Sequence, residues 1–187
     1  NTVIFYFSNI TNSFNRTATN VSGTWRVAAF NTSSLAEGTH TVKVFANDTV
    51  GNMNDSQTIS ITVDLTAPNV SITQPTNGKN FSFRSSLQDF NATVWDNTTL
   101  VNTVIFYFSN ITNSFNRTAT NVSGTWRVAA FNTSSLAEGT HTVKVFANDT
   151  LNNMNDSQTI SITVDLTAPN VSITQPTNGK NFSFRSS

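Results

Sequence analysis

The chain has 187 residues, no cysteine and a formal net charge of zero, with ten basic and ten acidic side chains. The balanced charge excludes the basic surface that nucleic-acid binding requires, and the lack of cysteine excludes a disulfide framework and a cysteine-based zinc site. Charged residues make up only 11% of the chain, against about 25% in ordinary globular proteins, so other polar groups must keep the surface soluble.

One long internal repeat organises the sequence. Residues 1–86 return as residues 102–187, an offset of 101 positions. Only two of the 86 aligned pairs differ, namely Val50/Leu151 and Gly51/Asn152. A period near one hundred residues is too long for a solenoid repeat and has the size of one β-sandwich domain.

The repeat predicts three parts. Residues 1–64 are expected to form a partial domain that lacks its opening strands, residues 65–165 a complete domain, and residues 166–187 the opening strands of a further domain. Either the sequence is a slice of a long covalent array, which we favour, or the tail of one subunit completes the head of the next by β-strand donation. In both cases the expected partner is the neighbouring identical domain, arranged head to tail.

Strand and turn patterns run through the complete unit. β-Branched and aromatic residues alternate with polar ones in short runs that Gly, Pro, Asn and Asp interrupt, which predicts an all-β domain. In chain order, the residues expected to point inward are Val70 and Ile72; Phe90, Ala92 and Val94; and Ile160, Ile162 and Val164. Between the last two sets, one strand is expected to hold Trp126, Val128 and Ala130, and another to carry Val143, Val145 and Ala147 on one face.

Three further segments complete the expected sheets. Phe81 and Phe83 are expected in a short edge piece, and the polar excursion Asn110–Gly124 in one weaker strand. The run Val104–Phe108 is apolar on both faces, which indicates a central strand whose outer side a neighbour or sugar covers. About seven strands at this spacing predict a β-sandwich of two sheets, tandemly repeated with the 101-residue period.

Several motifs carry a family resemblance. The segments are Asp64-Leu-Thr-Ala-Pro68 with the following Val70-Ser-Ile72, then Leu136-Ala-Glu-Gly-Thr-His-Thr-Val-Lys-Val145, then Ala147-Asn-Asp-Thr150. This pattern resembles the bacterial and archaeal immunoglobulin-like (Big-type) tandem repeats of cell-surface, S-layer and filament proteins. The resemblance implies an immunoglobulin-like sandwich in a stalk, coat or filament. His40 and His141 stand where related repeats often carry Tyr, so we do not expect a tyrosine-corner contact there.

Sites for N-glycosylation are unusually dense. In the first 101 residues, 14 Asn and 28 Ser or Thr would give about four Asn-x-Ser/Thr motifs by composition alone (14 × 28/101), whereas ten are present. The predicted acceptors are Asn9, Asn15, Asn20, Asn31, Asn47, Asn54, Asn69, Asn80, Asn91 and Asn97, followed in the second copy by Asn110, Asn116, Asn121, Asn132, Asn148, Asn155, Asn170 and Asn181.

Strand geometry agrees with acceptors that face solvent. Residues i and i+2 of a strand share a face, so Asn and Ser/Thr of one motif point together. In Asn69-Val-Ser71 and Asn91-Ala-Thr93 the apolar middle residue is expected inside, which leaves the acceptor outside. We therefore predict N-linked glycans on an extracellular surface, with the alternative that an Asn- and Thr-rich β protein carries such motifs by composition.

A second candidate site is calcium at the domain junctions. Asp64 and Asp165 end their strands beside the Thr-Ala-Pro linker, while Asp48, Asp149 and Asp96 fall in loops expected at the sandwich ends. Carboxylates from several loops suit Ca²⁺, although turn formation also explains Asp at such positions.

The sequence gives no sign of catalysis or of a membrane segment. Each period holds one His, and no nucleophile elbow, zinc-binding helix or phosphate loop is present. The longest aliphatic–aromatic run, Val104–Phe108, is far shorter than the ~20 residues of a bilayer span. We therefore expect no enzyme and no resident cofactor. Two functions stay open: a structural repeat of a secreted cell-surface polymer, or an adhesin-type module whose loops bind a partner cell or surface glycan.

Overall fold

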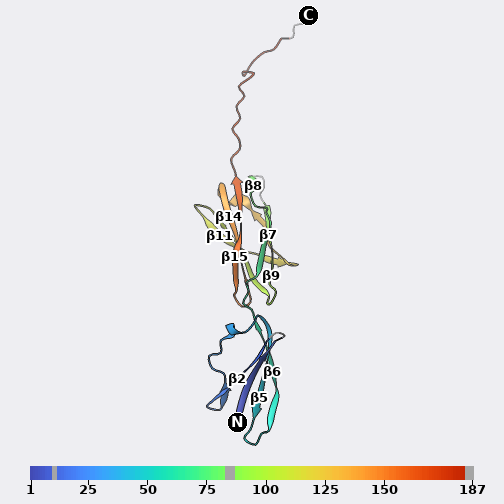
Figure 1. Cartoon of the computed structure of the whole chain (residues 1–187). Helices are drawn as coiled ribbons and strands as arrows, with labels where there is room; N and C mark the ends of the chain where they lie inside the picture. The colour runs from blue at the N-terminus through green and yellow to red at the C-terminus, as the bar shows by residue number, and fades with distance from the viewer. Residues whose placement is uncertain (10–11, 83–86, 184–187) are drawn as a thin grey trace.

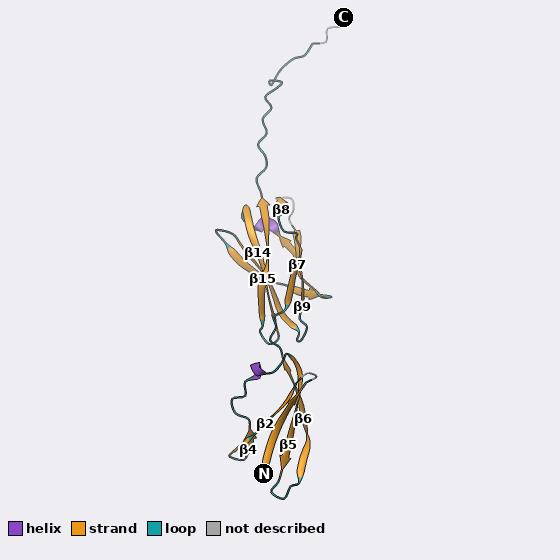
Figure 2. Ribbon diagram, viewed as in Figure 1, coloured by secondary structure: helices purple, strands orange, loops and turns teal. Residues whose placement is uncertain are grey.

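A computed structural model describes residues 1–9, 12–82 and 87–183. Two β domains stand end to end, and an extended C-terminal segment leaves the second one on the far side from the first (Figure 1). Apart from two short 3₁₀ turns, η1 (Thr32–Ser34) and η2 (Thr133–Ser135), the regular structure of this part of the chain is strand (Figure 2). None of the described residues lies in a helix long and apolar enough to cross a bilayer.

The second domain is a two-sheet sandwich. Its first sheet has the order β11-β10-β14-β15-β8 and its second the order β12-β13-β9-β7. The strands are β7 (Asn69–Gln74), β8 (Lys79–Ser82), β9 (Leu87–Trp95), β10 (Val101–Ser109), β11 (Ser114–Thr118), β12 (Thr120–Val122), β13 (Thr125–Asn132), β14 (Gly139–Asp149) and β15 (Met154–Asp165). All pairings are antiparallel except the one between β8 and β15. The chain thus enters in one sheet with β7 and crosses to the other with β8.

The first domain repeats these pairings over the part of the unit it contains. Its sheet has the order β2-β1-β5-β6, and β3 and β4 form a separate hairpin. The strands are β1 (Thr2–Ser8), β2 (Ser13–Thr17), β3 (Thr19–Val21), β4 (Thr24–Arg26), β5 (Gly38–Asn47) and β6 (Met53–Val63). Each residue pair of β1 with β2 recurs 101 positions later between β10 and β11.

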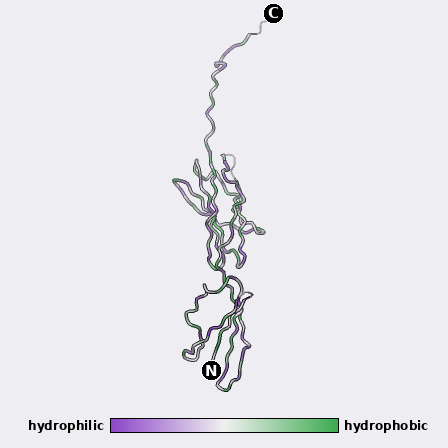
Figure 3. Tube along the Cα trace, viewed as in Figure 1, coloured by the Kyte–Doolittle hydropathy of each residue, from purple (hydrophilic) through white to green (hydrophobic). Residues whose placement is uncertain are grey.

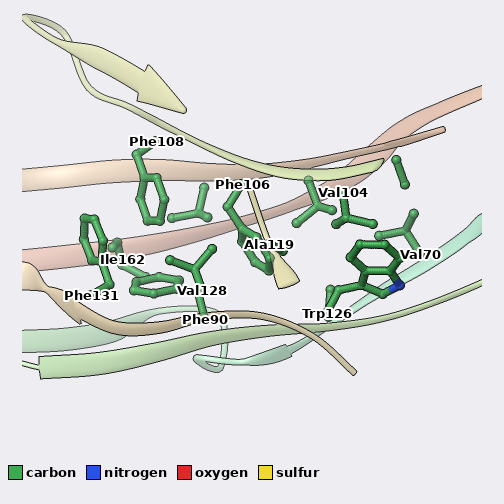
Figure 4. Close-up of a cluster of buried hydrophobic side chains, with 14 of the residues drawn as sticks. Val70, Phe90, Val104, Phe106, Phe108, Ala119, Trp126, Val128, Phe131 and Ile162 are labelled. Carbon is green, nitrogen blue, oxygen red and sulfur yellow. The ribbon is translucent and has the colours of Figure 1, made fainter. Parts of the chain in front are cut away.

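Alternation along the strands builds the core of the second domain. Hydrophobic and hydrophilic residues follow one another along the trace (Figure 3), so one face of each sheet is apolar. The core contains Phe rings from both sheets: Phe90 meets Phe108 edge to face with ring centroids 4.9 Å apart, and Phe108 stacks on Phe131 at 4.8 Å. Figure 4 shows these rings between the two sheets. Phe90 is fully buried, as the inward pattern predicts, and Phe108 is fully buried as well.

The same sequence is less ordered where its strand partner is missing. β13 pairs with β9 and extends over eight residues, Thr125–Asn132. In the first domain, no described strand takes the place of β9 beside the identical segment, and β4 covers only three residues, Thr24–Arg26. Trp126 is buried, whereas its copy Trp25 is half-buried. Ladder pairing and burial from a neighbouring strand, rather than local propensity, therefore set the length of this strand.

Two predictions about strands were wrong in detail. Ala130 is exposed and does not continue the alternation of Trp126 and Val128, because a β-bulge between Val128 and Phe131 inserts one extra residue and places Phe131 in the core. Asp89 fixes this bulge by accepting the Ala130 N–H at 2.9 Å. The excursion Asn110–Gly124 holds two strands, β11 and β12, one in each sheet. The described residues of the complete domain consequently form nine strands rather than about seven.

The other inward predictions agree with the burial, with Ile72 and Ile160 half-buried at the margin of the core. Phe81 is buried in β8, while Phe83 lies outside the described residues. At the corner, the His141 ring lies with Nε2 2.8 Å from the Ala137 carbonyl oxygen, four residues upstream. In immunoglobulin domains a tyrosine hydroxyl bonds to the backbone a few residues upstream, and here an imidazole makes a contact of that general kind.

The C-terminal segment has no strand within residues 166–183. In the complete domain the copy of this segment, β7, pairs only with β9 in its sheet. Among the described residues, no strand pairs with residues 170–175. The prediction that these residues are opening strands remains a prediction.

Candidate functional site

The junction between the two domains gathers three of the five aspartates that the sequence predicts as calcium ligands. The linker that follows β6 runs from Asp64 to Pro68. Two loops of the second domain face it, one at residues 96–99 between β9 and β10 and one at residues 150–153 between β14 and β15. The strand order therefore brings the end of one repeat against one end of the next sandwich.

Three carboxylates meet in this junction. Asp64, Asp96 and Asp149 each offer an oxygen, and these atoms all lie within 4.8 Å of one another. Asp64 comes from the first repeat and the other two from the second. Asp149 is fully buried and Asp64 is 6% exposed, whereas Asp96 is half-buried. The junction thus concentrates negative charge from both repeats in a place with little water.

Hydrogen bonds hold each carboxylate in place. Asp149 accepts the Leu151 N–H at 2.7 Å and the Asn153 side-chain amide at 2.7 Å. Burial alone would raise the pKa of Asp149, but the bonds from the Asn153 side chain and backbone and from Leu151 outweigh it and hold this pKa below its ordinary value of 3.8. Asp64 accepts a hydrogen bond from the Thr99 hydroxyl, which joins the two repeats.

A second polar contact closes the junction on its exposed side. Glu37, just before β5, accepts hydrogen bonds from the hydroxyls of Thr66 in the linker and Thr98 in the second domain. These two bonds, that of Thr66 first, lower the pKa of the Glu37 carboxyl below its ordinary value. One side chain therefore ties together the first domain, the linker and the second domain.

Two asparagines of the second domain bind the linker backbone directly. The Asn153 amide donates to the Asp64 carbonyl at 3.1 Å, and the Asn155 amide donates to the Pro68 carbonyl at 2.8 Å. These bonds satisfy carbonyl groups that an extended linker cannot pair within itself. The contacts also fix the direction in which the chain enters the second sandwich.

The structure brings three of the five predicted calcium ligands together and places the other two elsewhere. Asp48 caps its own exposed loop by accepting from Val50, Asn52 and the Asn52 amide. Asp165 accepts the Thr167 N–H, as Asp64 accepts the Thr66 N–H one period earlier.

The contact between the Glu before β5 and the linker Thr is repeated at the end of the second domain. The Thr167 hydroxyl donates to Glu138 at 2.7 Å, which repeats the bond from Thr66 to Glu37. Sequence reasoning missed Glu37, Thr66 and Thr98, because a lone Glu before a strand and two common Thr residues carry no local signal. Only their meeting in space defines the contact.

The geometry of the carboxylate cluster fits a divalent cation. Ca²⁺ binds oxygen ligands at 2.3–2.6 Å, so two ligands on opposite sides of one ion lie about 4.8 Å apart. Without a cation, each pair of these carboxylates repels by roughly 3 kcal/mol at an effective dielectric constant of about 20. Either a bound cation or a shared proton would relieve this repulsion.

The predicted glycan acceptors lie at the surface. Thirteen of the eighteen Asn residues are exposed and the other five, Asn9, Asn91, Asn110, Asn148 and Asn155, are half-buried. Several also stabilise turns through the side-chain oxygen, such as Asn132, which accepts the Ser134 N–H and caps η2. Turn formation therefore explains part of the Asn content. Asn155 differs because its amide nitrogen is engaged in the junction.

Family comparisons agree with this architecture. Three family profiles match: a bacterial Ig-like domain over residues 2–65, a bacterial Ig domain over residues 68–145, and a bacterial Ig-like domain of group 3 over residues 124–185. Together they cover nearly the whole sequence, so the chain belongs to the bacterial immunoglobulin-like domains, as its motifs predicted. No curated protein matches the chain.

Solved structures with a similar arrangement include repeat proteins. A tetra-tandem repeat from the extending region of a large adhesion protein is 25% identical, with a TM-score of 0.46 over 89% of this chain and 42% of that one. A Ca²⁺-stabilised adhesin of an Antarctic bacterium is 18% identical, with a TM-score of 0.39 over 89% and 41%. The fibronectin(III)-like modules of Clostridium thermocellum CbhA are 18% identical, with a TM-score of 0.38 over 87% and 77%.

Proposed function

We propose that this chain is a structural repeat of a secreted, N-glycosylated cell-surface polymer, in which tandem immunoglobulin-like domains form a stiff stalk, coat or filament. The observation that carries the proposal is the junction. Four side-chain hydrogen bonds cross from one repeat to the next or to its linker, through Thr98, Thr99, Asn153 and Asn155.

The repetition of the sequence supports the same role. Glu138 and Thr167 already make the contact that Glu37 and Thr66 make at the first junction. Each further copy would therefore meet its neighbour in the same way, so that a long array would keep one direction. In a mechanical role every unit bears the same load, so the units can share one sequence. The two copies agree with this, since 84 of their 86 aligned positions are identical.

Calcium at the junction is part of this proposal. Asp64, Asp96 and Asp149 are the residues that would hold the ion, since they belong to both repeats and lie within 4.8 Å of one another. The ion would neutralise charge and tie three chain segments together. Its role would be structural, and no chemical reaction is assigned to it.

The proposed coat of sugar rests on the surface position of the acceptor residues. Thirteen acceptors are exposed, and they occur in both domains and in the C-terminal segment. Only 11% of the residues are charged. Glycans would supply the surface hydration that so few charged side chains cannot provide.

Surface labelling tests the proposed location. Antibodies raised against the 187-residue chain are expected to label intact cells of the source organism, and mass spectrometry of the native protein is expected to find hexose-containing peptides at the predicted asparagines. Label that appears only after the cells are permeabilised would contradict a cell-surface role.

A binding role is the second candidate. Ile111 is fully exposed, and Val122 is exposed at the end of β12. Both residues belong to the excursion Asn110–Gly124, whose loops would present them to a partner in this role. Binding of the chain to whole cells that is lost in an Ile111→Ser variant would favour this adhesin-type function over a purely structural one.

A further inference from the structure

An apolar stripe runs across the outer face of each large sheet. In the second domain it consists of Ile105, Tyr107, Phe146 and Met154, and we call it the outer stripe. The first three side chains are half-buried, and Met154 is 64% exposed. The Tyr107 and Phe146 rings meet edge to face with centroids 6.1 Å apart. This face points away from the sandwich core, so the second sheet of the domain does not cover it.

The first domain carries the same stripe in Ile4, Tyr6, Phe45 and Met53. These four residues and Asn15 line an open hollow of ≈ 370 Å³. A smaller hollow in the second domain, ≈ 180 Å³, is lined by Thr103, Ile105, Phe146, Ala147, Asn148 and Met154. The acceptor Asn15 thus borders the hollow of the first domain, whereas the acceptor at the hollow of the second domain is Asn148.

Strand register places one acceptor beside the tyrosine. Asn116 of β11 lies directly opposite Tyr107 of β10, and Thr118, the third residue of its motif, lies opposite Ile105. In an antiparallel pair such residues share a face, with Cβ atoms about 4.5–5.5 Å apart. Asn15 and Tyr6 stand in the same relation one period earlier.

The Asn116 side chain is also available for modification. It is exposed and, within the described part of the chain, its amide makes no hydrogen bond, in contrast to Asn132 and Asn155. Acceptor and hydroxyl residue of the motif lie on a regular strand and project from the same face.

We propose that Asn116 and Asn15 carry N-glycans whose first sugars pack on the outer stripe of their own domain. This inference rests on the proposed glycosylation and specifies where the sugar lies. One face of a pyranose ring presents C–H groups, which pack on the electron-rich face of an aromatic ring. The covalent bond to Asn116 would hold the first sugar beside Tyr107. Packing on the ring would therefore cost the sugar little translational and conformational entropy.

The surroundings of the stripe favour sugar over a protein partner. Lys144 lies over the Phe146 ring, 5.1 Å from its centroid, and pairs with Asp156 at 2.7 Å. These charged groups offer hydrogen bonds to sugar hydroxyls at the margin of the apolar surface. A protein docking on the same face would meet the acceptors Asn116 and Asn148 on both sides of the stripe.

Tyrosine NMR tests the proposal, because Tyr6 and Tyr107 are the two tyrosines of the chain. The full chain is produced with ring-¹³C tyrosine in a host that performs N-glycosylation, and occupancy is read by mass spectrometry. We expect cross-peaks between the Tyr107 ring and sugar protons. These should vanish in Asn116→Gln, and the ring signal should move to its position in the unglycosylated chain. The control Asn97→Gln, which removes an exposed acceptor in a loop away from the stripe, should leave both unchanged.

Four results would overturn the inference. Occupied Asn116 with a Tyr107 signal identical to that of Asn116→Gln would show that the sugar does not pack on the stripe. An unoccupied Asn116 beside other occupied acceptors would refute this site and leave the sugar coat intact, whereas no occupancy anywhere would refute the sugar coat as well. Dimerisation of the glycosylated chain that Tyr107→Ser abolishes would assign the stripe to a second copy instead.

Discussion

Removal of one carboxylate from the junction tests whether calcium binds there. Asp149→Asn takes away the buried member of the Asp64–Asp96–Asp149 cluster and two of its three repulsive pairs. If Ca²⁺ binds the native cluster, a concentration a hundredfold above Kd stabilises the folded state by about 2.7 kcal/mol. At 4–8 °C per kcal/mol, this corresponds to a rise in Tm of about 10–20 °C.

The repeat supplies a matched control for this experiment. Asp48 makes the same hydrogen bonds to its loop as Asp149 but lies exposed, away from the cluster. Asp48→Asn should therefore keep the calcium-dependent rise in Tm, and Asp149→Asn should lose most of it. The assay is differential scanning calorimetry in Ca²⁺ and in chelator, with Kd from titration calorimetry. Native chain without any calcium-dependent rise, or an equal rise in both variants, would refute the metal site and leave a shared proton as the way in which the carboxylates coexist.

Three further predictions follow from particular residues. Phe106→Ala should lower the free energy of unfolding by about 3–5 kcal/mol, because Phe106 is fully buried. Phe5→Ala, at the half-buried copy of this position, should lower it by less. Urea unfolding of both variants measures the two losses, and equal losses would contradict the prediction. Because the pKa of Asp149 is lowered in the folded state, the ionised carboxylate stabilises the fold above the ordinary pKa of 3.8, and this stabilisation is lost as the pH falls through the lower folded-state pKa. The decrease of Tm with falling pH should therefore be shallower in Asp149→Asn than in the native chain. Thr98→Val should remove the hydrogen bond to Glu37 and loosen the junction, which amide exchange at residues 96–99 would report as faster exchange, and unchanged exchange would argue against the contact.

The alternation of residue types predicted most of the sandwich. Val143, Val145 and Ala147 lie inside because the period of two fixes which face of a strand is apolar. The same rule placed Ala130 wrongly, since a bulge adds a residue and reverses the alternation that follows. That bulge depends on Asp89, which lies far along the chain and gives no signal near Ala130.

The candidate site was predicted only as far as residue type and loop position allow. Asp64, Asp96 and Asp149 end strands or lie in loops next to them, so a meeting at one end of the sandwich was expected, and the structure brings these three together. The loop of Asp48 differs from that of Asp149 only at Val50/Leu151 and Gly51/Asn152, but within the described residues no linker of a preceding repeat packs on it. The surroundings that separate the two aspartates are tertiary, and the local sequence does not express them.

Domain orientation in solution tests the central claim most directly, because a stiff stalk requires that the junction fix one repeat relative to the next. Residual dipolar couplings of backbone amides would be measured for the full chain in a weakly aligning medium. Couplings from residues 2–9 and 12–64 and from residues 69–82 and 87–165 should fit a single alignment tensor when the two domains are placed as in Figure 1. Two unequal tensors, with strongly reduced alignment of the first domain, would show that the domains turn independently and would contradict the proposed stalk.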